Sequence, residues 1–466
     1  MQMMKWSVMA VAIAAATSQM AYANESDESD SNIAHATESM SSQAASNGFM
    51  EDADLQLLNR NFAFYRNFKN NAPTDQNYRS EWAHAFLTTF TSGFTQGTVG
   101  FGVDAFGNAG YKLNSGAGTG GTGLLPVDGS DPSKGQDAYG IAGGAVKARI
   151  SETVLKFGQQ RPESPVFATG DSRLMPAYAT GTSIMSEEIS DLALQGGHFY
   201  SGNGTDSTNQ DGELATYYGG TAFNTADYIG GDYTFSDNLS MGVHAAQYED
   251  LWNQYYADLY HTMDLGDDMS LSTSLNYYNT QDTGKANGGD ISNNTYSASL
   301  ALSVGVQTFT LAHQNVNGDT PFDYVTTGGS TGNSIWLANA VQYSDFVMPN
   351  EKSYQARYDI DLSDMVMPGL SFMARYITGS GADGTGADCS PNGAYCGQVG
   401  NNEDEWERDI EVKYVVQTGA AKDLSIRVRQ ATWRASQGVS RDAYGSGNSN
   451  AVDEIRIITE YPLDIL

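Results

Sequence analysis

The sequence predicts an all-β protein and, within that class, a transmembrane antiparallel β-barrel around a polar lumen. Three observations predict it. Apolar and polar residues alternate with a period of two from residue 55 onward, clusters of Gly, Asn and Asp separate the alternating runs, and helical periodicity is nearly absent. The chain also begins with an export segment, and no later stretch is apolar for long enough to form a transmembrane helix.

Composition limits the classes of function. The chain has 466 residues, with 24 Lys+Arg against 55 Asp+Glu, and a formal charge of −31. So acidic a chain is a poor nucleic-acid binder, because phosphate contacts need clustered cations. Charged residues make up 17%, below the about 25% of an average soluble domain, whereas Gly (51) and Tyr (27) are abundant. This balance favours many strands with small polar faces.

Residues 1–23 are predicted to be a cleaved secretory signal peptide. Lys5 supplies the positive start, residues 6–16 are apolar, and Ala21-Tyr22-Ala23 forms a small-x-small cleavage site. A buried helix or a membrane anchor is the alternative, but the apolar run is shorter than the about 20 residues that span a bilayer. We therefore expect an exported protein.

Residues 24–54 carry eight acidic residues and no Lys or Arg, so we expect a flexible acidic tail there. The strand pattern then occupies 55–466. It recurs in 269–278, 295–304 and 423–430, where polar and apolar residues take opposite faces. The last of these runs sets Leu424, Ile426 and Val428 against Ser425, Arg427 and Arg429.

Two architectures bury one face of such strands. A soluble sandwich packs that face against a second sheet, whereas a transmembrane barrel turns it to lipid and keeps the polar face around water. The uniformly small polar faces and the predicted export favour the barrel. At about 22–24 residues for each strand and its loop, residues 55–466 would form a barrel of porin size.

Residues 159–195 form the longest early gap between strand-like segments. Gaps of this length are usually functional or disordered, and the functional form in a barrel is a loop folded inward as a constriction. The alternative is a loop on the outer surface. We expect a polar eyelet built from Arg173, Tyr178 and Ser183.

Basic residues gather in the last quarter of the chain, where 351–466 holds eleven of the 24 Lys+Arg. Because strand side chains alternate, residues two apart face the same side, and parity places these cations in the lumen. A row of them would lower the barrier for a carboxylate that passes from one guanidinium to the next. Alternatively, the cations merely balance inward acids such as Asp359, Asp361, Glu411 and Glu454. The predicted pore-lining cations are Arg357, Arg375, Lys413, Arg427, Arg429 and Arg456, together with Lys147 and Arg149.

No motif predicts an enzyme, a cofactor or a metal site. Gly100-x-Gly102 lacks the strand-turn-helix context of a nucleotide site, no Ser/His/Asp set stands out, and the six His show no metal spacing. Cys389 and Cys396 enclose six residues in a Gly/Asp/Asn-rich segment. In an oxidising compartment we expect them to form a disulfide that staples an external loop.

Several motifs across 55–466 resemble the OprD-type outer-membrane porins, which are substrate-specific carboxylate channels. The resemblance implies an eighteen-stranded monomeric barrel with an inward-folded third loop. It places Lys413, Arg427 and Arg429 on the family's basic ladder, and Tyr343 and Asp345 on an acidic pocket opposite; Ala340 departs from the hydroxyl residue often found there. The motifs are Asn59 to Phe62, Tyr65 to Phe68, Ser92 to Gly100, Lys147 to Ser151 with Leu155-Lys156, Gly318 to Pro321, Leu337 to Asn339, Gln342 to Phe346, Phe372 to Tyr376, Glu407 to Ile410, Leu424 to Arg429, and Tyr461 to Leu463.

The expected function is passive, selective diffusion of small carboxylate-bearing solutes, such as amino acids and organic acids, through an outer-membrane barrel. Its partners would be outer-membrane lipid and lipopolysaccharide, with no nucleic acid and no catalysis. Two alternatives remain open at this point. The many Tyr also suit a channel for oligosaccharides, whose rings stack on aromatic side chains, and a barrel enzyme or adhesin would need a catalytic or loop-binding constellation.

Overall fold

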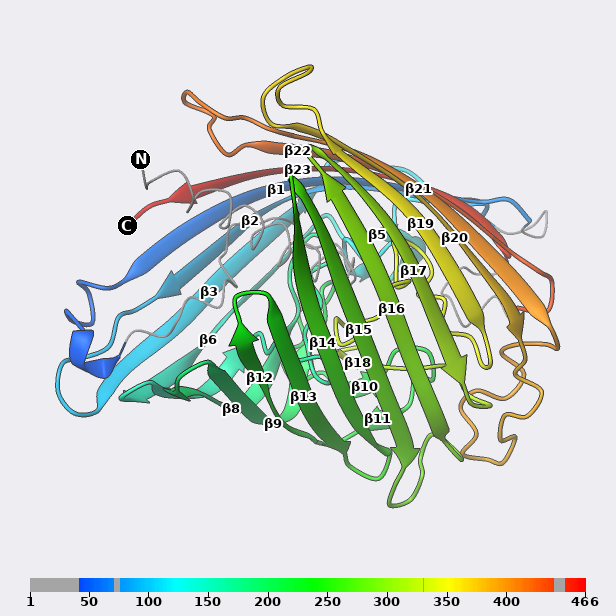
Figure 1. Cartoon of the computed structure of the whole chain (residues 1–466), viewed down its shortest axis with the longest axis horizontal. Coiled ribbons are helices and arrows are strands. Elements are labelled where there is room, and N and C mark those ends of the chain that lie inside the picture. The colour runs from blue at the N-terminus through cyan, green and yellow to red at the C-terminus, as the bar shows by residue number, and fades with distance from the viewer. Residues whose placement is uncertain (1–41, 71–75, 330, 440–448) are drawn as a thin grey trace.

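The computed structural model describes residues 42–70, 76–329, 331–439 and 449–466, so the predicted signal peptide and most of the predicted tail lie outside the described residues. Its main element is an antiparallel sheet of eighteen strands (Figure 1). The strands are β1 (Asp54–Phe68), β2 (Tyr78–Thr91), β3 (Gly100–Lys112), β6 (Ala138–Ile150), β7 (Thr153–Gln160), β8 (Tyr178–Ile189), β9 (Leu192–Asn203), β12 (Ala226–Ser236), β13 (Leu239–Tyr248), β14 (Trp252–Gly266), β15 (Met269–Asp282), β16 (Ser292–Val304), β17 (Gln307–Asn317), β19 (Lys352–Asp361), β20 (Leu370–Ala382), β21 (Glu403–Val415), β22 (Ser425–Ala435) and β23 (Ala451–Asp464).

The sheet closes on itself because the first and last strands pair. Gln56 lies opposite Asp464, and Phe68 lies opposite Val452, so β1 runs antiparallel to β23 along nearly its whole length. Every other barrel strand pairs with its neighbours in chain order, which confirms the predicted eighteen-stranded barrel. Within the described ranges, no helix is long and apolar enough to cross a membrane.

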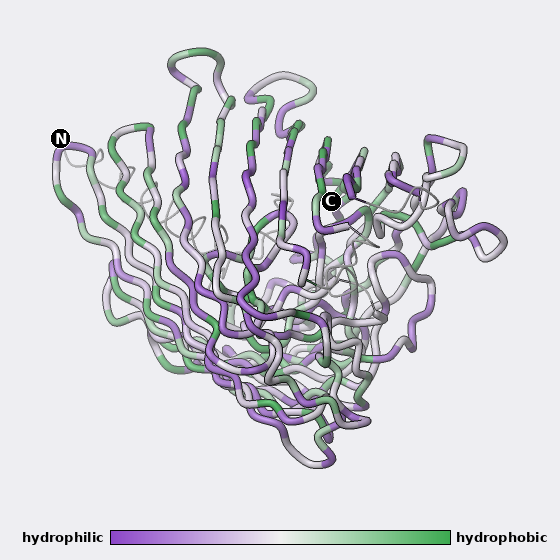
Figure 2. The backbone as a smooth tube through the Cα atoms, turned by 90° about the vertical axis from the view of Figure 1, so that its right-hand side faces the viewer, coloured by the Kyte–Doolittle hydropathy of each residue, from purple (hydrophilic) through white to green (hydrophobic). Residues whose placement is uncertain are grey.

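Alternation decides which side chains face lipid and which face the lumen. In β22, Ile426 and Val428 are 39% and 40% exposed, whereas Arg429 between Val428 and Gln430 is 1% exposed. Hydrophobic and hydrophilic residues alternate in this way along the strands (Figure 2). The lumen therefore collects the polar half of each strand, as a barrel in lipid requires.

The two ends of the barrel differ. Short turns such as 151–152, 190–191 and 267–268 join strands at one end, where β1 also begins and β23 ends. Asp267 and Asp268 both have left-handed φ values, 50° and 58°, which suit a tight hairpin. Longer connections lie at the other end. By the usual arrangement of outer-membrane barrels, the short-turn end is periplasmic and the long-loop end is extracellular.

The remaining small elements are not strands of the barrel wall; they belong to the connections between strands and to the segment before β1. One three-stranded sheet joins two extracellular connections, because β10 pairs with both β11 and β18. The small elements are the 3₁₀ helix η1 (Gln43–Ala45), β4 (Val127–Asp128), β5 (Asp131–Gly135), β10 (Leu214–Thr216), β11 (Ala222–Phe223) and β18 (Val325–Thr327).

Part of the predicted tail is held against the barrel. Gln43 is buried, its Nε2 donates to Thr95 O at 2.9 Å, and its Oε1 accepts from Arg149 Nε at 2.9 Å. The chain is thus fixed to the wall from residue 42 onward, ahead of the boundary at 54 that composition suggested.

The predicted gap over 159–195 is wrong in extent. Residues 178–189 and 192–203 are strands β8 and β9, so the connection spans only 161–177. The register between β8 and β9 shifts twice: Tyr200 of β9 is an extra residue opposite Thr180 and Gly181, and β8 has one extra residue between Ser186 and Ile189. Bulges of this kind turn successive side chains to one face and hide a strand from pattern analysis.

Candidate functional site: the lumen and its constriction

The connection between β7 and β8, residues 161–177, crosses the lumen. Its backbone carbonyls accept from two tyrosines of the far wall, Val166 O from the Tyr248 hydroxyl and Pro165 O from the Tyr278 hydroxyl, the latter at 2.9 Å. Its other end reaches β1, where Arg60 Nη1 donates to Asp171 Oδ1 at 2.8 Å. This third extracellular connection is the inward-folded constriction loop that was predicted.

A second connection, residues 318–351, also folds inward and runs along the wall. On one side its backbone donates to strand side chains, with Ala338 N to Ser297 Oγ at 3.0 Å and Asn339 N to Gln314 Oε1 at 2.9 Å. On the other side it reaches β21, where Tyr343 N and Ser344 N each donate to Glu407 at 2.8 Å. Together the two loops narrow the lumen.

The space between these loops is a cavity of about 880 Å³ with charges of both signs. Cations come from four different parts of the chain, and they meet the acidic and aromatic side chains of the loops. Tyr217 and Tyr324 stack there with ring centroids 5.0 Å apart. The charged and aromatic lining residues are Arg66, Arg79, Arg173, Arg456, Asp206, Asp211, Glu213, Asp345, Tyr217, Tyr324 and Tyr343.

Asp345 is the acidic side chain at the centre of this constriction. It accepts hydrogen bonds from the hydroxyls of Tyr218 and Tyr324, the second at 3.1 Å. Burial raises the pKa of Asp345 to about 6, against the opposing effect of the two hydroxyl donors. The negative charge of the constriction therefore depends on pH near neutrality.

One wall of the barrel carries a row of inward cations on consecutive strands. Arg357 of β19 lies opposite Arg375 of β20, and Arg429 of β22 lies opposite Arg456 of β23. Lys413 and Arg427 form a further pair one step nearer the periplasm. These six residues face the lumen, as parity predicted, and they connect the constriction to a lower cavity of about 350 Å³ lined by Arg357 and Lys413.

Carboxylates pair with this row. Arg375 Nε lies 2.7 Å from Asp409 Oδ2, and both Arg427 and Arg429 reach Glu411, at 3.0 and 3.1 Å. Arg357 pairs with Asp359 at 2.8 Å, and Arg456 with Glu454 at 2.5 Å. Three of the four acids considered in the sequence as balancing charges, Asp359, Glu411 and Glu454, thus contact the cations directly.

Comparison with known proteins identifies the architecture. The family described as "outer membrane porin, OprD family" matches residues 47–465. Porin D of Pseudomonas aeruginosa is 46% identical over 472 residues, covering 100% of both chains, and Porin-like protein GalP of Pseudomonas putida is 34% identical, covering 91% of this chain and 95% of its own. The chain belongs to the OprD family of outer-membrane porins.

Solved structures agree with this assignment. The crystal structure of Pseudomonas aeruginosa OprD matches with a TM-score of 0.78 at 46% identity, covering 92% of this chain and 99% of that one. Pseudomonas aeruginosa OpdK, solved with vanillate, matches with a TM-score of 0.78 at 33% identity, covering 90% and 100%. This OprD-family porin therefore resides in the outer membrane of a Gram-negative cell.

Two of the predicted basic residues of the porin lie apart from the row. Lys147 and Arg149 face inward from β6, with Lys147 Nζ 2.7 Å from Asp104 Oδ1. Arg149 lies over the Phe94 ring, its Cζ 4.2 Å from the centroid, and bonds to Gln43 at the short-turn end. They belong to a separate inward cluster on the opposite side of β1.

The predicted eyelet residues also divide. Arg173, Tyr343 and Asp345 line the constriction cavity, but Tyr178 and Ser183 do not. Tyr178 stacks on Phe106 with centroids 3.7 Å apart, and Ser183 Oγ donates to Gln160 Oε1 at 2.6 Å. Both residues belong to β8 rather than to the loop, so their side chains contact neighbouring strands of the barrel wall.

Sequence reasoning missed several constriction residues of the porin. Arg66 could have been found, because it shares the inward parity of Phe62 and Phe64 in β1. Tyr217 and Tyr324 could not, because loop residues have no period and their convergence depends on β10 pairing with β18.

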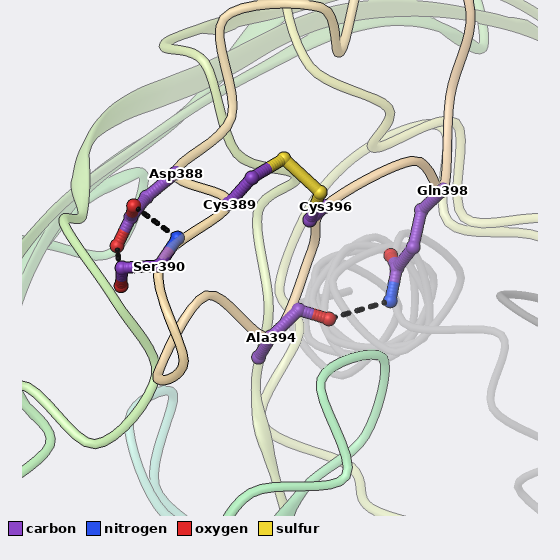
Figure 3. Close-up of a disulfide and its surroundings, with 6 residues drawn as sticks. All are labelled: Asp388, Cys389, Ser390, Ala394, Cys396 and Gln398. Atoms are coloured by element: carbon purple, nitrogen blue, oxygen red, sulfur yellow. Dashed lines mark hydrogen bonds between the residues drawn. A yellow bond between two sulfur atoms is a disulfide. The ribbon is translucent and has the colours of Figure 1, made fainter.

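The extracellular loop between β20 and β21 is closed by a disulfide between Cys389 and Cys396 (Figure 3). Gln398 Nε2 donates to Ala394 O at 3.2 Å and to Tyr218 O at 3.1 Å. The Tyr395 hydroxyl donates to Asp323 Oδ2 at 3.0 Å. The stapled loop thus contacts the backbone around Tyr218, which itself bonds to Asp345.

Proposed function

We propose that this porin carries small carboxylate-bearing solutes by passive diffusion, as a monomer and without catalysis. The observation that supports it most is the row of inward guanidinium groups on β19, β20, β22 and β23, which leads from the constriction to the lower cavity. A guanidinium binds a carboxylate through two parallel hydrogen bonds. Successive sites of this kind favour entry while leaving no single site of tight capture.

The protein carboxylates that pair with the row keep the free-energy change small each time a solute binds to one guanidinium and leaves it. A passing carboxylate competes with Glu411 for Arg427 and Arg429, and with Asp359 for Arg357. Exchange of one carboxylate for another costs little, since the guanidinium keeps a partner throughout. The acids that balance the row are therefore compatible with selective passage, and they account for part of the acidic excess inside a carboxylate pathway.

The constriction favours a solute with charges of both signs. Arg66, Arg173 and Arg456 line the cavity together with Asp345. A zwitterion such as an amino acid could present its carboxylate to the cations and its ammonium group to Asp345. That OpdK was solved with vanillate is consistent with carboxylate ligands among relatives.

The decisive test is solute flux through Arg427→Gln/Arg429→Gln in liposomes. We expect carboxylate flux to fall about tenfold, which corresponds to about 1.4 kcal/mol of added barrier. The matched control is Lys147→Gln/Arg149→Gln, which removes the same charge from β6 and should change flux much less. Glu411→Gln should act in the opposite direction and raise carboxylate flux. Equal flux in all four proteins would refute the role of the row.

The same panel tests the oligosaccharide alternative, which the stacked rings of Tyr217 and Tyr324 in the constriction favour. A sugar channel would pass neutral oligosaccharides faster than amino acids of similar size, and it would be insensitive to the Arg427 and Arg429 substitutions.

A further inference from the structure

Basic side chains on the outer face of this barrel occupy one sector. In the described barrel strands, outward-facing Lys and Arg occur only at Lys352, Arg408 and Arg434, in β19, β21 and β22. All three lie in the half of their strands nearer the long loops. Lys69, directly after β1, adds a fourth cation to this side. A chain with a net charge of −31 thus presents a local cluster of cations toward the lipid.

We define the outer basic patch as Lys69, Arg408 and Arg434. Arg408 Nη2 donates to two neutral neighbours, Gln430 Oε1 at 3.1 Å and Thr432 Oγ1 at 3.2 Å. Within the part of the chain that the structure describes, no carboxylate pairs with Arg408.

The other two cations of the patch share one acid. Arg434 Nη2 lies 2.8 Å from Asp453 Oδ1, and Lys69 Nζ lies 2.9 Å from Asp453 Oδ2. Asp404 also faces outward above Trp406, where it accepts from Gly381 N at 3.4 Å. The three cations therefore exceed the two nearby carboxylates by one charge.

The patch lies where the hydrocarbon layer meets the outer headgroups. Tyr376, Arg408, Thr432 and Asp453 lie opposite one another across four strands. Tyr376 stacks on Trp406 with centroids 5.8 Å apart, and outward aromatic side chains of this kind are expected at a membrane interface. Toward the periplasm, exposed apolar residues begin at once, with Val412, Val428, Ile455 and Ile457.

Cations at this depth have a specific chemical use. A charged side chain on a lipid-facing surface costs free energy unless it meets an anion or water, so its presence indicates a partner. Arginine binds phosphate oxygens through two parallel hydrogen bonds, and clustered cations at a bilayer surface attract anionic headgroups.

We propose that the outer basic patch binds the phosphate of a phosphorylated outer-leaflet lipid. Arg408 supplies a guanidinium whose partners are neutral. Arg434 and Lys69, which pair with Asp453, would reorient to bind the lipid phosphate. The acyl chains of the same lipid lie on the apolar strip formed by Val428 and Ile455. The apolar strip directly below the cations argues for a lipid rather than a free phosphate ion.

The test measures lipid binding to the purified porin in detergent by native mass spectrometry. With bisphosphorylated lipid A as probe, we expect Arg408→Gln/Arg434→Gln to bind about ten- to thirtyfold more weakly than the unaltered porin, from about 1 kcal/mol for each basic residue at a membrane surface. Arg408→Lys should recover part of the binding. Arg408→Gln alone, which removes no carboxylate partner, serves if the double variant does not fold.

The matched control is Lys134→Gln/Lys285→Gln, which removes two positive charges from extracellular connections, where the two lysines pair with Asp131 and Asp250. It should bind lipid A like the unaltered porin. The proposal is overturned if the control loses as much binding as the patch variant, or if dephosphorylated lipid A binds as tightly. Displacement of bound lipid A by millimolar inorganic phosphate would likewise show a site for a free ion and overturn it.

Discussion

The two loops that narrow the lumen are held in place by different forces. Loop 161–177 is held by packing, with Phe167 stacked on Phe199 at 4.9 Å, and by neutral hydrogen bonds from Tyr248 and Tyr278 to its carbonyls. Loop 318–351 is held on β21 by two carboxylates: Glu407 accepts from the backbone of Tyr343 and Ser344, and Glu405 accepts from the Ser344 hydroxyl. Where loop 161–177 meets the far wall it is fixed by packing and neutral bonds, although Asp171 also pairs with Arg60 at the β1 end, whereas loop 318–351 is fixed on β21 by carboxylates.

This difference has a functional consequence. Apolar packing depends on the area that is buried and hardly on pH or salt, whereas a buried carboxylate that loses its charge or one oxygen leaves a backbone donor without an acceptor. Changes of size in loop 161–177 should therefore alter the width of the pore. Changes of charge around loop 318–351 should alter how steadily the pore holds its shape and which ions it prefers.

The largest expected effect comes from shortening the packed loop. Deleting residues 164–169 removes the segment that reaches Tyr248 and Tyr278 and should raise single-channel conductance by at least about threefold. Planar-bilayer recording measures it. Removing 285–288 from the connection after β15 is the control, and it should leave conductance unchanged. A deletion with unaltered conductance would mean that loop 161–177 does not set the width of the pore.

A smaller effect should follow from Glu407→Gln. Its two oxygens accept separately from Tyr343 N and Ser344 N, so an amide leaves one donor unsatisfied at a cost of about 1–3 kcal/mol. We expect frequent current fluctuations, seen in single-channel traces as noise around the normal open level.

Tyr248→Phe is the corresponding change for the other loop. It removes one neutral hydrogen bond, from the Tyr248 hydroxyl to Val166 O, and should add less noise than Glu407→Gln, since such a bond contributes about 0.5–1.5 kcal/mol. Equal noise in the two variants would erase the distinction between the loops.

The smallest effect concerns pH. Because burial raises the pKa of Asp345 to about 6, this carboxylate is ionised at pH 7.5 and mostly protonated at pH 5. Acidification thus removes a negative charge from the constriction, and the anion-to-cation permeability ratio should rise by about twofold. The ratio is obtained from reversal potentials in a salt gradient.

Two variants decide the origin of this response. Asp345→Asn should show the low-pH ratio at both pH values. Asp323 has a pKa that burial also raises to about 6, but it does not line the cavity. Asp323→Asn should therefore retain the pH response, and a response lost in Asp323→Asn but kept in Asp345→Asn would reverse the assignment.

Strand alternation explains what could be predicted from the sequence. A closed barrel keeps inward and outward faces strictly separate, so parity alone placed Arg357, Arg375 and Arg429 in the lumen. It failed at β8, where an extra residue between Ser186 and Ile189 breaks the period. It also could not show that Lys147 and Arg149 belong to another sector, because the position of a strand around the barrel is not encoded in its alternation.

The constriction was less accessible to prediction for a physical reason. Its charged and aromatic side chains come from β1, β2, β23 and three connections, and their meeting depends on contacts between segments far apart in the sequence, such as Leu214 opposite Thr327. Arg173 and Asp345 were found in advance, whereas Tyr217 and Asp206 were not. Loop residues carry no period from which their direction can be read.

Pairing of β1 with β23 has a consequence for biogenesis. The partners Gln56 and Asp464 are far apart in the sequence, so the seam cannot form before β23 has been synthesised. A chain that ends early would leave two rows of backbone amides and carbonyls facing hydrocarbon, where neither water nor a neighbouring strand satisfies them. A nonsense mutation that removes β23 should therefore be as damaging as one that removes most of the barrel.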